Sequence, residues 1–192
     1  MIEIRKSEFA KKGHKVILEK LLKLCNGQGL LGEGITRILD AGSGRTSLKE
    51  IQKAFPAAQV DAVVYPGDER KLKSIEPYLT EQVRVLECDI CETSFEKSYD
   101  LVVAHLLLGE AGKFENTFDK VLSRLLAIDS LYFILIDYVE DPEVNEANIR
   151  EFCVENSYEI LQQVKEECSE PQTWRDFTGY HNFGYLIYNL DQ

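Results

Sequence analysis

The sequence predicts an α/β fold: a doubly wound, mostly parallel sheet with helices on both faces and an antiparallel hairpin at its C-terminal edge. Apolar runs of strand length alternate with stretches whose apolar residues recur at helical spacing, which is the pattern of βαβ units. The run 131–138 is apolar almost throughout, as expected for a strand buried on both faces. Two strand-like runs near the end have no helix between them, which indicates an antiparallel pair.

The elements follow one another in regular order. The chain opens with an amphipathic helix that is expected to end near Asn26 and Gly27. Strands are expected at 36–40, 60–65, 83–86, 99–104, 131–138, 158–165 and 180–190. Helical stripes fall between them at 48–55, 72–79, 114–125 and 149–153.

A single domain is expected over 1–192, because this length supports one hydrophobic core and is short for two. Its parts are a helical cover (1–30), a core (31–157) and a hairpin (158–192). The apolar stretches are too short to span a bilayer, and the first residues lack the pattern of a signal peptide. We therefore expect a cytoplasmic protein without a membrane partner; its oligomeric state is not indicated.

Charge and cysteine content narrow the expected partners. The net charge of -11 repels phosphate backbones, which disfavours nucleic acid but says little about small molecules or proteins. The expected partner is a small-molecule substrate. Five cysteines, an odd number, indicate free thiols in a reducing compartment. Cys88 and Cys91 have the CxxC spacing, but no second ligand pair lies at a compatible distance, so buried thiols are favoured and no metal is expected.

A glycine-rich turn follows the first strand, with Asp40 before Gly42 and Gly44. Ligands of open α/β sheets bind beyond the carboxyl ends of the strands, and such glycines let the backbone approach them. A dinucleotide site would place a third glycine where Ser47 stands, and the Gly-Lys-Ser/Thr of a P-loop is missing. The carboxylate of Asp40 would repel a phosphate and attract a cation such as an α-ammonium group.

The segment Asp40-Ala41-Gly42-Ser43-Gly44 resembles the first motif of the class I S-adenosylmethionine-dependent methyltransferases. The resemblance covers roughly residues 36–138 and implies a seven-stranded sheet whose last strand is antiparallel. It also implies S-adenosyl-L-methionine as cofactor and methyl transfer as activity. In that family the acid holds the amino end of the methionine part, directly or through water, and the glycines pass beneath it; Asp40, Gly42, Ser43 and Gly44 take these places.

Two further matches imply the remaining cofactor contacts. Asp89 follows the third strand, where the family often has an Asp that accepts a hydrogen bond from the adenine amino group, and Ile90 would flank the ring. Ala104 ends the fourth strand, beside the expected methionine part. The family's ribose-binding acid is replaced by Val64, so Tyr65 is expected to contact the cofactor, and Asp68 is the nearest carboxylate that could substitute.

Methyl transfer needs aligned reactants and, for some acceptors, a base. The candidates are His105, Glu110, Asp137 and Tyr138; we place His105 first because imidazole titrates near neutral pH, with packing as its alternative role. Aromatic residues in 174–185 could wall an acceptor pocket or pack the hairpin. Two other functions stay open: a catalytically silent S-adenosylmethionine-binding domain, favoured by the missing ribose acid, and a nicotinamide oxidoreductase, disfavoured by Ser47.

Overall fold

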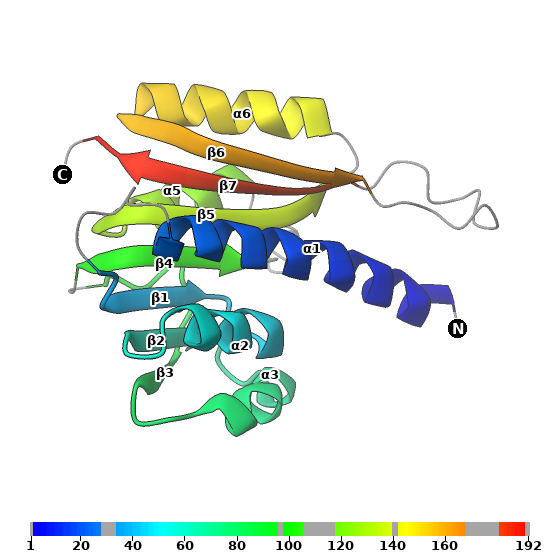
Figure 1. Cartoon of the computed structure of the whole chain (residues 1–192), viewed down its shortest axis with the longest axis vertical. Helices are drawn as coiled ribbons and strands as arrows, with labels where there is room; N and C mark the ends of the chain where they lie inside the picture. The colour runs from blue at the N-terminus through cyan, green and yellow to red at the C-terminus, as the bar shows by residue number, and fades with distance from the viewer. Residues whose placement is uncertain are drawn as a thin grey trace.

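The computed structural model describes residues 2–27, 34–95, 98–105, 118–139, 142–167 and 181–190. Its strands form one sheet in the order β3-β2-β1-β4-β5-β7-β6 (Figure 1). The bounds are β1 (Arg37–Ala41), β2 (Gln59–Val64), β3 (Val83–Glu87), β4 (Tyr99–His105), β5 (Ser130–Val139), β6 (Tyr158–Glu167) and β7 (His181–Asn189). Strands β1 to β5 pair in parallel, and β7 pairs antiparallel with both β5 and β6. The predicted mostly parallel seven-stranded sheet with an antiparallel edge hairpin is confirmed.

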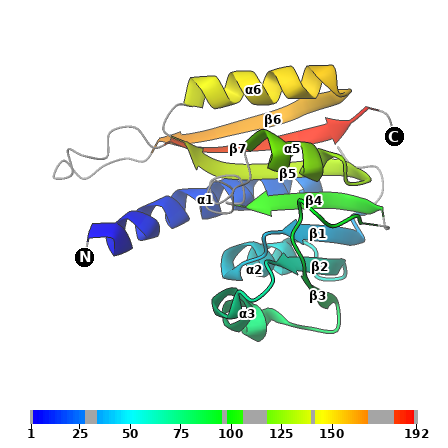
Figure 2. The ribbon, with the colours of Figure 1, turned by 180° about the vertical axis from the view of Figure 1, so that it is seen from behind.

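Helices cover both faces of the sheet. On one face lie α1 (Ile2–Gly27), α2 (Arg45–Ala54) and α3 (Glu69–Ile75), and on the other lie α5 (Phe118–Leu126) and α6 (Pro142–Glu155) (Figures 1 and 2). The stripe predicted at 72–79 is the end of α3 followed by a 3-10 turn, η1 (Glu76–Tyr78). Pro77 has no N–H to donate to a continuing helix, which explains the break. The first four residues of the stripe predicted at 114–125 lie outside the described residues.

The sheet separates two apolar layers, because side chains alternate along each strand. On β4, Leu101 and Val103 pack in the layer under α1, whereas Val102 and Ala104 pack in the layer under α5. All four side chains are almost completely buried. This two-sided burial explains why the central strands read as continuous apolar runs rather than alternating ones.

Helix α1 packs closely on the edge hairpin. A Cβ atom on Gly184 of β7 would lie 2.3 Å from Cγ2 of Ile17 and 2.9 Å from Cδ1 of Leu21. The glycine therefore sets how near the helix can come to the strand. None of the described helices combines the length and the apolar composition that crossing a membrane requires.

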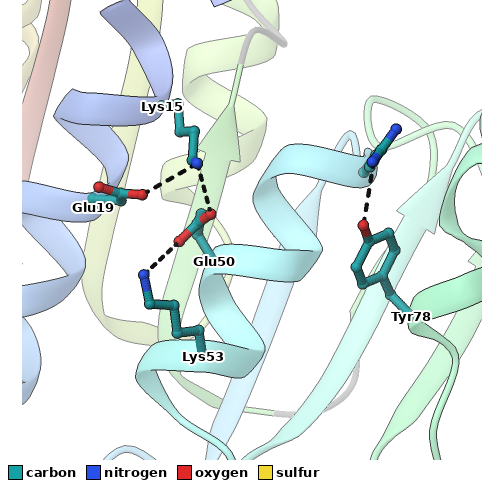
Figure 3. A network of polar contacts seen from close by, with 6 residues as sticks. Lys15, Glu19, Glu50, Lys53 and Tyr78 are labelled. Carbon is teal, nitrogen blue, oxygen red and sulfur yellow. Dashed lines mark hydrogen bonds and ion pairs between the residues drawn. The ribbon is translucent and has the colours of Figure 1, made fainter. Parts of the chain in front are cut away.

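A buried carboxylate ties α1 to α2. Glu50 is 3% exposed, and its two oxygens lie 3.5 Å from Nζ of Lys15 and 3.6 Å from Nζ of Lys53 (Figure 3). Lys15 also lies 3.5 Å from Glu19 one turn further along α1. Because a buried charge is costly unless it is paired, the Lys15–Glu50 pair holds the two helices in one relative position, and Lys53 pairs with Glu50 within α2.

Ser157 joins α6 to β6 with a φ of 59°, in the left-handed region that costs a residue with a Cβ about 1 kcal/mol. Its carbonyl accepts the N–H of Leu190 at 2.9 Å, which holds this conformation. We expect Ser157→Gly to raise the free energy of unfolding in urea by about 0.5–1 kcal/mol. Ser157→Ala keeps the strain and should differ from the parent by less than about 0.5 kcal/mol. A loss of stability in Ser157→Gly would contradict this reading.

Candidate functional site

The strand register brings the carboxyl ends of β1, β2 and β4 together. Asp40 pairs with Ala62 on one side and Val103 on the other, and Ala41 pairs with Ala104. The turn after β1 is anchored to β2, because the N–H of Ser43 donates to the carbonyl of Val63 at 2.7 Å. The carboxyl ends of these strands therefore form the sheet edge at which the sequence predicts a ligand, and the glycine-rich turn lies at the centre of this edge.

Asp40 is fully buried at this edge. Its Oδ2 accepts hydrogen bonds from the hydroxyls of Ser43 at 2.5 Å and Ser47 at 2.8 Å. Burial raises the pKa of the carboxyl to about 6, against the opposing effects of the two hydroxyls and of the charge on Lys71. Oδ1 accepts no hydrogen bond within the described part of the chain. The carboxylate thus holds the turn and the start of α2 in place, and one of its oxygens remains for a further donor.

Ser47 has a second contact that shapes the turn. Its hydroxyl oxygen accepts the N–H of Gly44 at 3.1 Å, while its own proton can go to Asp40. Ser47 stands where a dinucleotide-binding fold has a glycine, and its hydrogen bonds hold the first turn of α2 in place. A Ser three residues after the N-cap was a readable signal for this arrangement.

The two glycines meet the requirements of a close backbone approach. Gly42 has a φ of 75°, a conformation that side chains rarely adopt. Gly44 is extended, with a φ of -146°, and a Cβ built on it would meet no atom within 4 Å. The space beside Gly44 is open, as a ligand at this turn would need.

The end of β2 departs from the expected ligand set. Val64 is completely buried, so the place of the ribose-binding acid holds a core side chain. Tyr65 follows it and is 40% exposed. Asp68 accepts the N–H of Lys71 at 3.0 Å as the N-cap of α3, so its carboxylate has a structural role in the loop.

Beyond β3, Asp89 and Ile90 have structural contacts of their own. Oδ1 of Asp89 accepts the N–H of Cys91 at 2.8 Å, and its carbonyl accepts the N–H groups of Glu92 and Thr93. Ile90 is 7% exposed and packs in the apolar layer under α5. These bonds fix the shape of the chain at the place where the resemblance implies an adenine contact.

His105, the predicted base, ends β4 and is 8% exposed. Burial lowers the pKa of its imidazole to about 4, and the charge on Lys71 lowers it further in the same direction. Its ring meets His14 of α1 edge-on, with centroids 5.8 Å apart and planes at 89°. Burial and the neighbouring His105 lower the pKa of His14 to about 3. Both rings are therefore neutral at pH 7.

Sequence reasoning missed His14 and Lys71. His14 lies on a stripe that reads as a core-covering helix, and nothing in its neighbourhood indicates that it meets a histidine of β4. Lys71 lies on α3, and its positive charge acts on both Asp40 and His105. The side chains of Glu110, Asp137 and Tyr138, and the aromatic residues at 174–183, lie outside what the structure describes.

Two hollows of the described structure lie away from this edge. One, of about 320 Å³, is lined by residues near the amino ends of the strands, among them Arg37 and Tyr99. The other, of about 280 Å³, lies between the end of α1 and residues 54–58. Neither hollow is lined by Asp40 or Gly44.

Comparison with known proteins supports the fold. No protein-family model and no curated protein matches the sequence. Among solved structures, the plantazolicin methyltransferase BpumL, in complex with a triazolic desmethylPZN analog and SAH, is similar over 96% of this chain and 89% of its own, with 15% identity and a TM-score of 0.66. The Burkholderia thailandensis 1,6-didemethyltoxoflavin-N1-methyltransferase, with bound 1,6-didemethyltoxoflavin and S-adenosylhomocysteine, is similar over 93% and 79%, with 16% identity and a TM-score of 0.62.

An rRNA methylase from Escherichia coli is similar over 91% of this chain and 64% of its own, with 16% identity and a TM-score of 0.60. The chain spans about 62–64% of several of the structures it matches. At these low identities the similarity shows a shared fold, and this fold confirms the architecture implied by the motif at Asp40. The named proteins act on RNA in one case and on small molecules in others.

Proposed function

We propose that this chain binds S-adenosylmethionine over the turn at residues 40–47 and transfers its methyl group to a small-molecule acceptor. The observation that carries the proposal is the open space beside Gly44, next to a buried carboxylate with an uncommitted oxygen, at the edge where β1 and β4 end. The positive φ of Gly42 lets the backbone turn under a ligand there.

The residues of the turn have different roles in the proposed binding site. Gly42 and Gly44 allow close approach, and Asp40 positions Ser43 and Ser47 while its Oδ1 stays available to a donor, directly or through water. Because Asp40 is fully buried, we assign it mainly a positioning role. We propose that Tyr65, Asp89, Ile90 and Ala104 line the rest of the cofactor site.

When bound, S-adenosylmethionine supplies an electrophilic methyl group, so the protein mainly has to orient the acceptor and exclude water. His105 would act as a base only after regaining solvent, because a pKa of about 4 makes a weak proton acceptor at neutral pH. An acceptor that is already deprotonated needs no base. The net charge of -11 favours a small acceptor over a polyanion.

Calorimetry with S-adenosylhomocysteine tests the binding site. We expect the parent to bind in the micromolar range, roughly -8 kcal/mol, and Gly44→Asn to weaken binding at least tenfold, about 1.4 kcal/mol. Asn is a good N-cap and finds free space at Gly44, so the variant should keep its stability while its side chain occupies the ligand's place.

The matched control is Gly34→Asn, since Gly34 also has nothing within 4 Å of a built Cβ but lies at the other end of β1. It should bind like the parent. Equal affinity of Gly44→Asn and the parent would remove the turn from the site. No binding by the parent at millimolar ligand would reject the cofactor assignment.

A catalytically silent binding domain is the second candidate, favoured by the buried Val64 at the place of the ribose acid. Incubation with methyl-labelled cofactor and a metabolite extract separates the two. Label in a small-molecule fraction supports the enzyme, and its loss in Gly44→Asn assigns the activity to this site. Tight binding without label in any fraction supports the silent domain.

A further inference from the structure

Among the described residues, no helix covers β1, β2 and β3 on the sheet face under α5. Parallel strands are usually joined through a helix, but the described residues between β3 and β4, 88–95 and 98, form turns only (Figure 2). Ile90 and Cys91 are buried, and Phe95 packs against the same apolar layer. These residues cover part of the face, and the hollow of about 320 Å³ lies near the amino ends of the strands.

Polar side chains from four strands line this hollow: Arg37, Gln59, Asp61, Arg84 and Tyr99. Arg84 forms a two-point ion pair with Asp61, with Nε to Oδ1 at 2.8 Å and Nη2 to Oδ2 at 2.6 Å. The hydroxyl of Tyr99 donates to Oδ2 of Asp61 at 2.8 Å. Both oxygens of Asp61 are therefore engaged by protein donors.

Arg37 differs from Arg84 in having no carboxylate within ion-pair distance among the described residues, although its charge acts on Asp100, whose Oδ2 accepts the backbone N–H of Arg37 at 2.8 Å. Its guanidinium carbon lies 5.5 Å from the centre of the Tyr99 ring, a cation–π contact, and within the described residues its side chain forms no ion pair. A guanidinium stacked on an aromatic ring is held in place while its N–H donors stay available. Among the residues that line the hollow, Arg37 and Arg84 carry positive charges and Asp61 a negative one, in a chain whose net charge is -11.

We propose that this hollow, which we call the Arg37 pocket, binds a small molecule through an oxyanion group, a carboxylate or a phosphate. Arginine pairs with both groups through two parallel hydrogen bonds. The volume of about 320 Å³ is at the lower end of small-ligand sites, and its charged lining does not suit an apolar protein surface. The ion pair with Asp61 engages the guanidinium of Arg84, whereas the guanidinium of Arg37 lies over the ring of Tyr99 and forms no ion pair among the described residues.

The Arg37 pocket is distinct from the proposed methyl-transfer site. Arg37 begins β1 and Ala41 ends it, so about 13 Å of strand separates the pocket from the glycine-rich turn. Arg37 also faces the layer under α5, whereas Asp40 lies on the opposite face of β1. The proposal therefore stands or fails independently of the cofactor assignment.

Titration of the full chain with sodium phosphate and with sodium succinate, at constant ionic strength set by chloride, tests the pocket. The readout is the side-chain Nε–H signals of Arg37 and Arg84 in nitrogen–proton NMR spectra. We expect a saturable shift with at least one anion in the millimolar range. Saturation by one anion alone identifies the oxyanion as phosphate or carboxylate.

Variants separate a built site from general charge effects. Arg37→Gln should weaken anion binding at least fivefold, and Arg37→Lys should restore part of it. Arg124→Gln, which removes an exposed charge of the same kind from α5, should bind like the parent. Gly44→Asn should also bind the anion normally. Absence of saturation with both anions, or equal binding by Arg37→Gln and the parent, overturns the proposal.

Discussion

Gly184→Ala is expected to lower the free energy of unfolding by about 2–3 kcal/mol, the cost of overpacking a close helix–strand contact. The added methyl group would lie 2.3 Å from Ile17 and 2.9 Å from Leu21, so α1 must move away from β7. Ile17 and Leu21 are fully buried and cannot give way at the surface. The same shift would disturb the contact of His14 with His105 and so reach the proposed site.

A double-mutant cycle gives the decisive measurement for this contact. Ile17→Ala removes the methyl group that the new Cβ would strike, so the double variant should be less destabilised than the sum of the two single ones by at least about 1 kcal/mol. Gly34→Ala, at an open position, is the control and should change little. Additive effects in urea unfolding would show that α1 does not rest on Gly184.

The second large effect is an acid-dependent loss of stability governed by His14, His105 and Asp40. In the folded protein the pKa values of His14 and His105 lie at about 3 and about 4, below the ordinary histidine value of 6.5. At pH values between the folded pKa and 6.5, each histidine binds more protons in the unfolded chain than in the folded one. Each histidine therefore makes the free energy of unfolding fall as the pH drops below 6.5. Asp40 has a raised pKa of about 6 against 3.8, so it acts in the opposite direction between those two values.

The net effect follows from the number of protons. From about pH 6 to pH 4, unfolding takes up two protons on the histidines and releases one from Asp40, a net uptake of one. Stability should therefore fall by roughly 1.4 kcal/mol per pH unit on acidification across this window. The charge on Lys71 acts on both His105 and Asp40.

Two variants should move this slope in opposite directions. His14→Leu removes one proton uptake and should bring the slope near zero, whereas Asp40→Asn removes the proton release and should roughly double it. The measurement is the free energy of unfolding in urea at several pH values from 6.5 to 4. Equal slopes in the parent and both variants would mean that these three groups do not govern the acid response.

The order of strands and helices was predictable because it depends on patterns only a few residues long. The apolar run at 131–138 and the stripes between strands reflect local burial, and the structure confirms the order derived from them. The glycine-rich turn was equally readable, since Gly42 needs a positive φ that few other residues adopt. The end of α3 was not predicted from the apolar spacing, because this spacing continues beyond Pro77 although the proline ends the helix.

What the sequence determined by itself was the architecture and the position of the turn at the end of β1. Only the tertiary structure placed Asp40 out of contact with solvent, His14 against His105, and Arg37 in a pocket with Arg84. The reason is physical: helix and strand patterns depend on which face of one element is buried. The burial and charge of a single side chain depend on which distant segments pack around it.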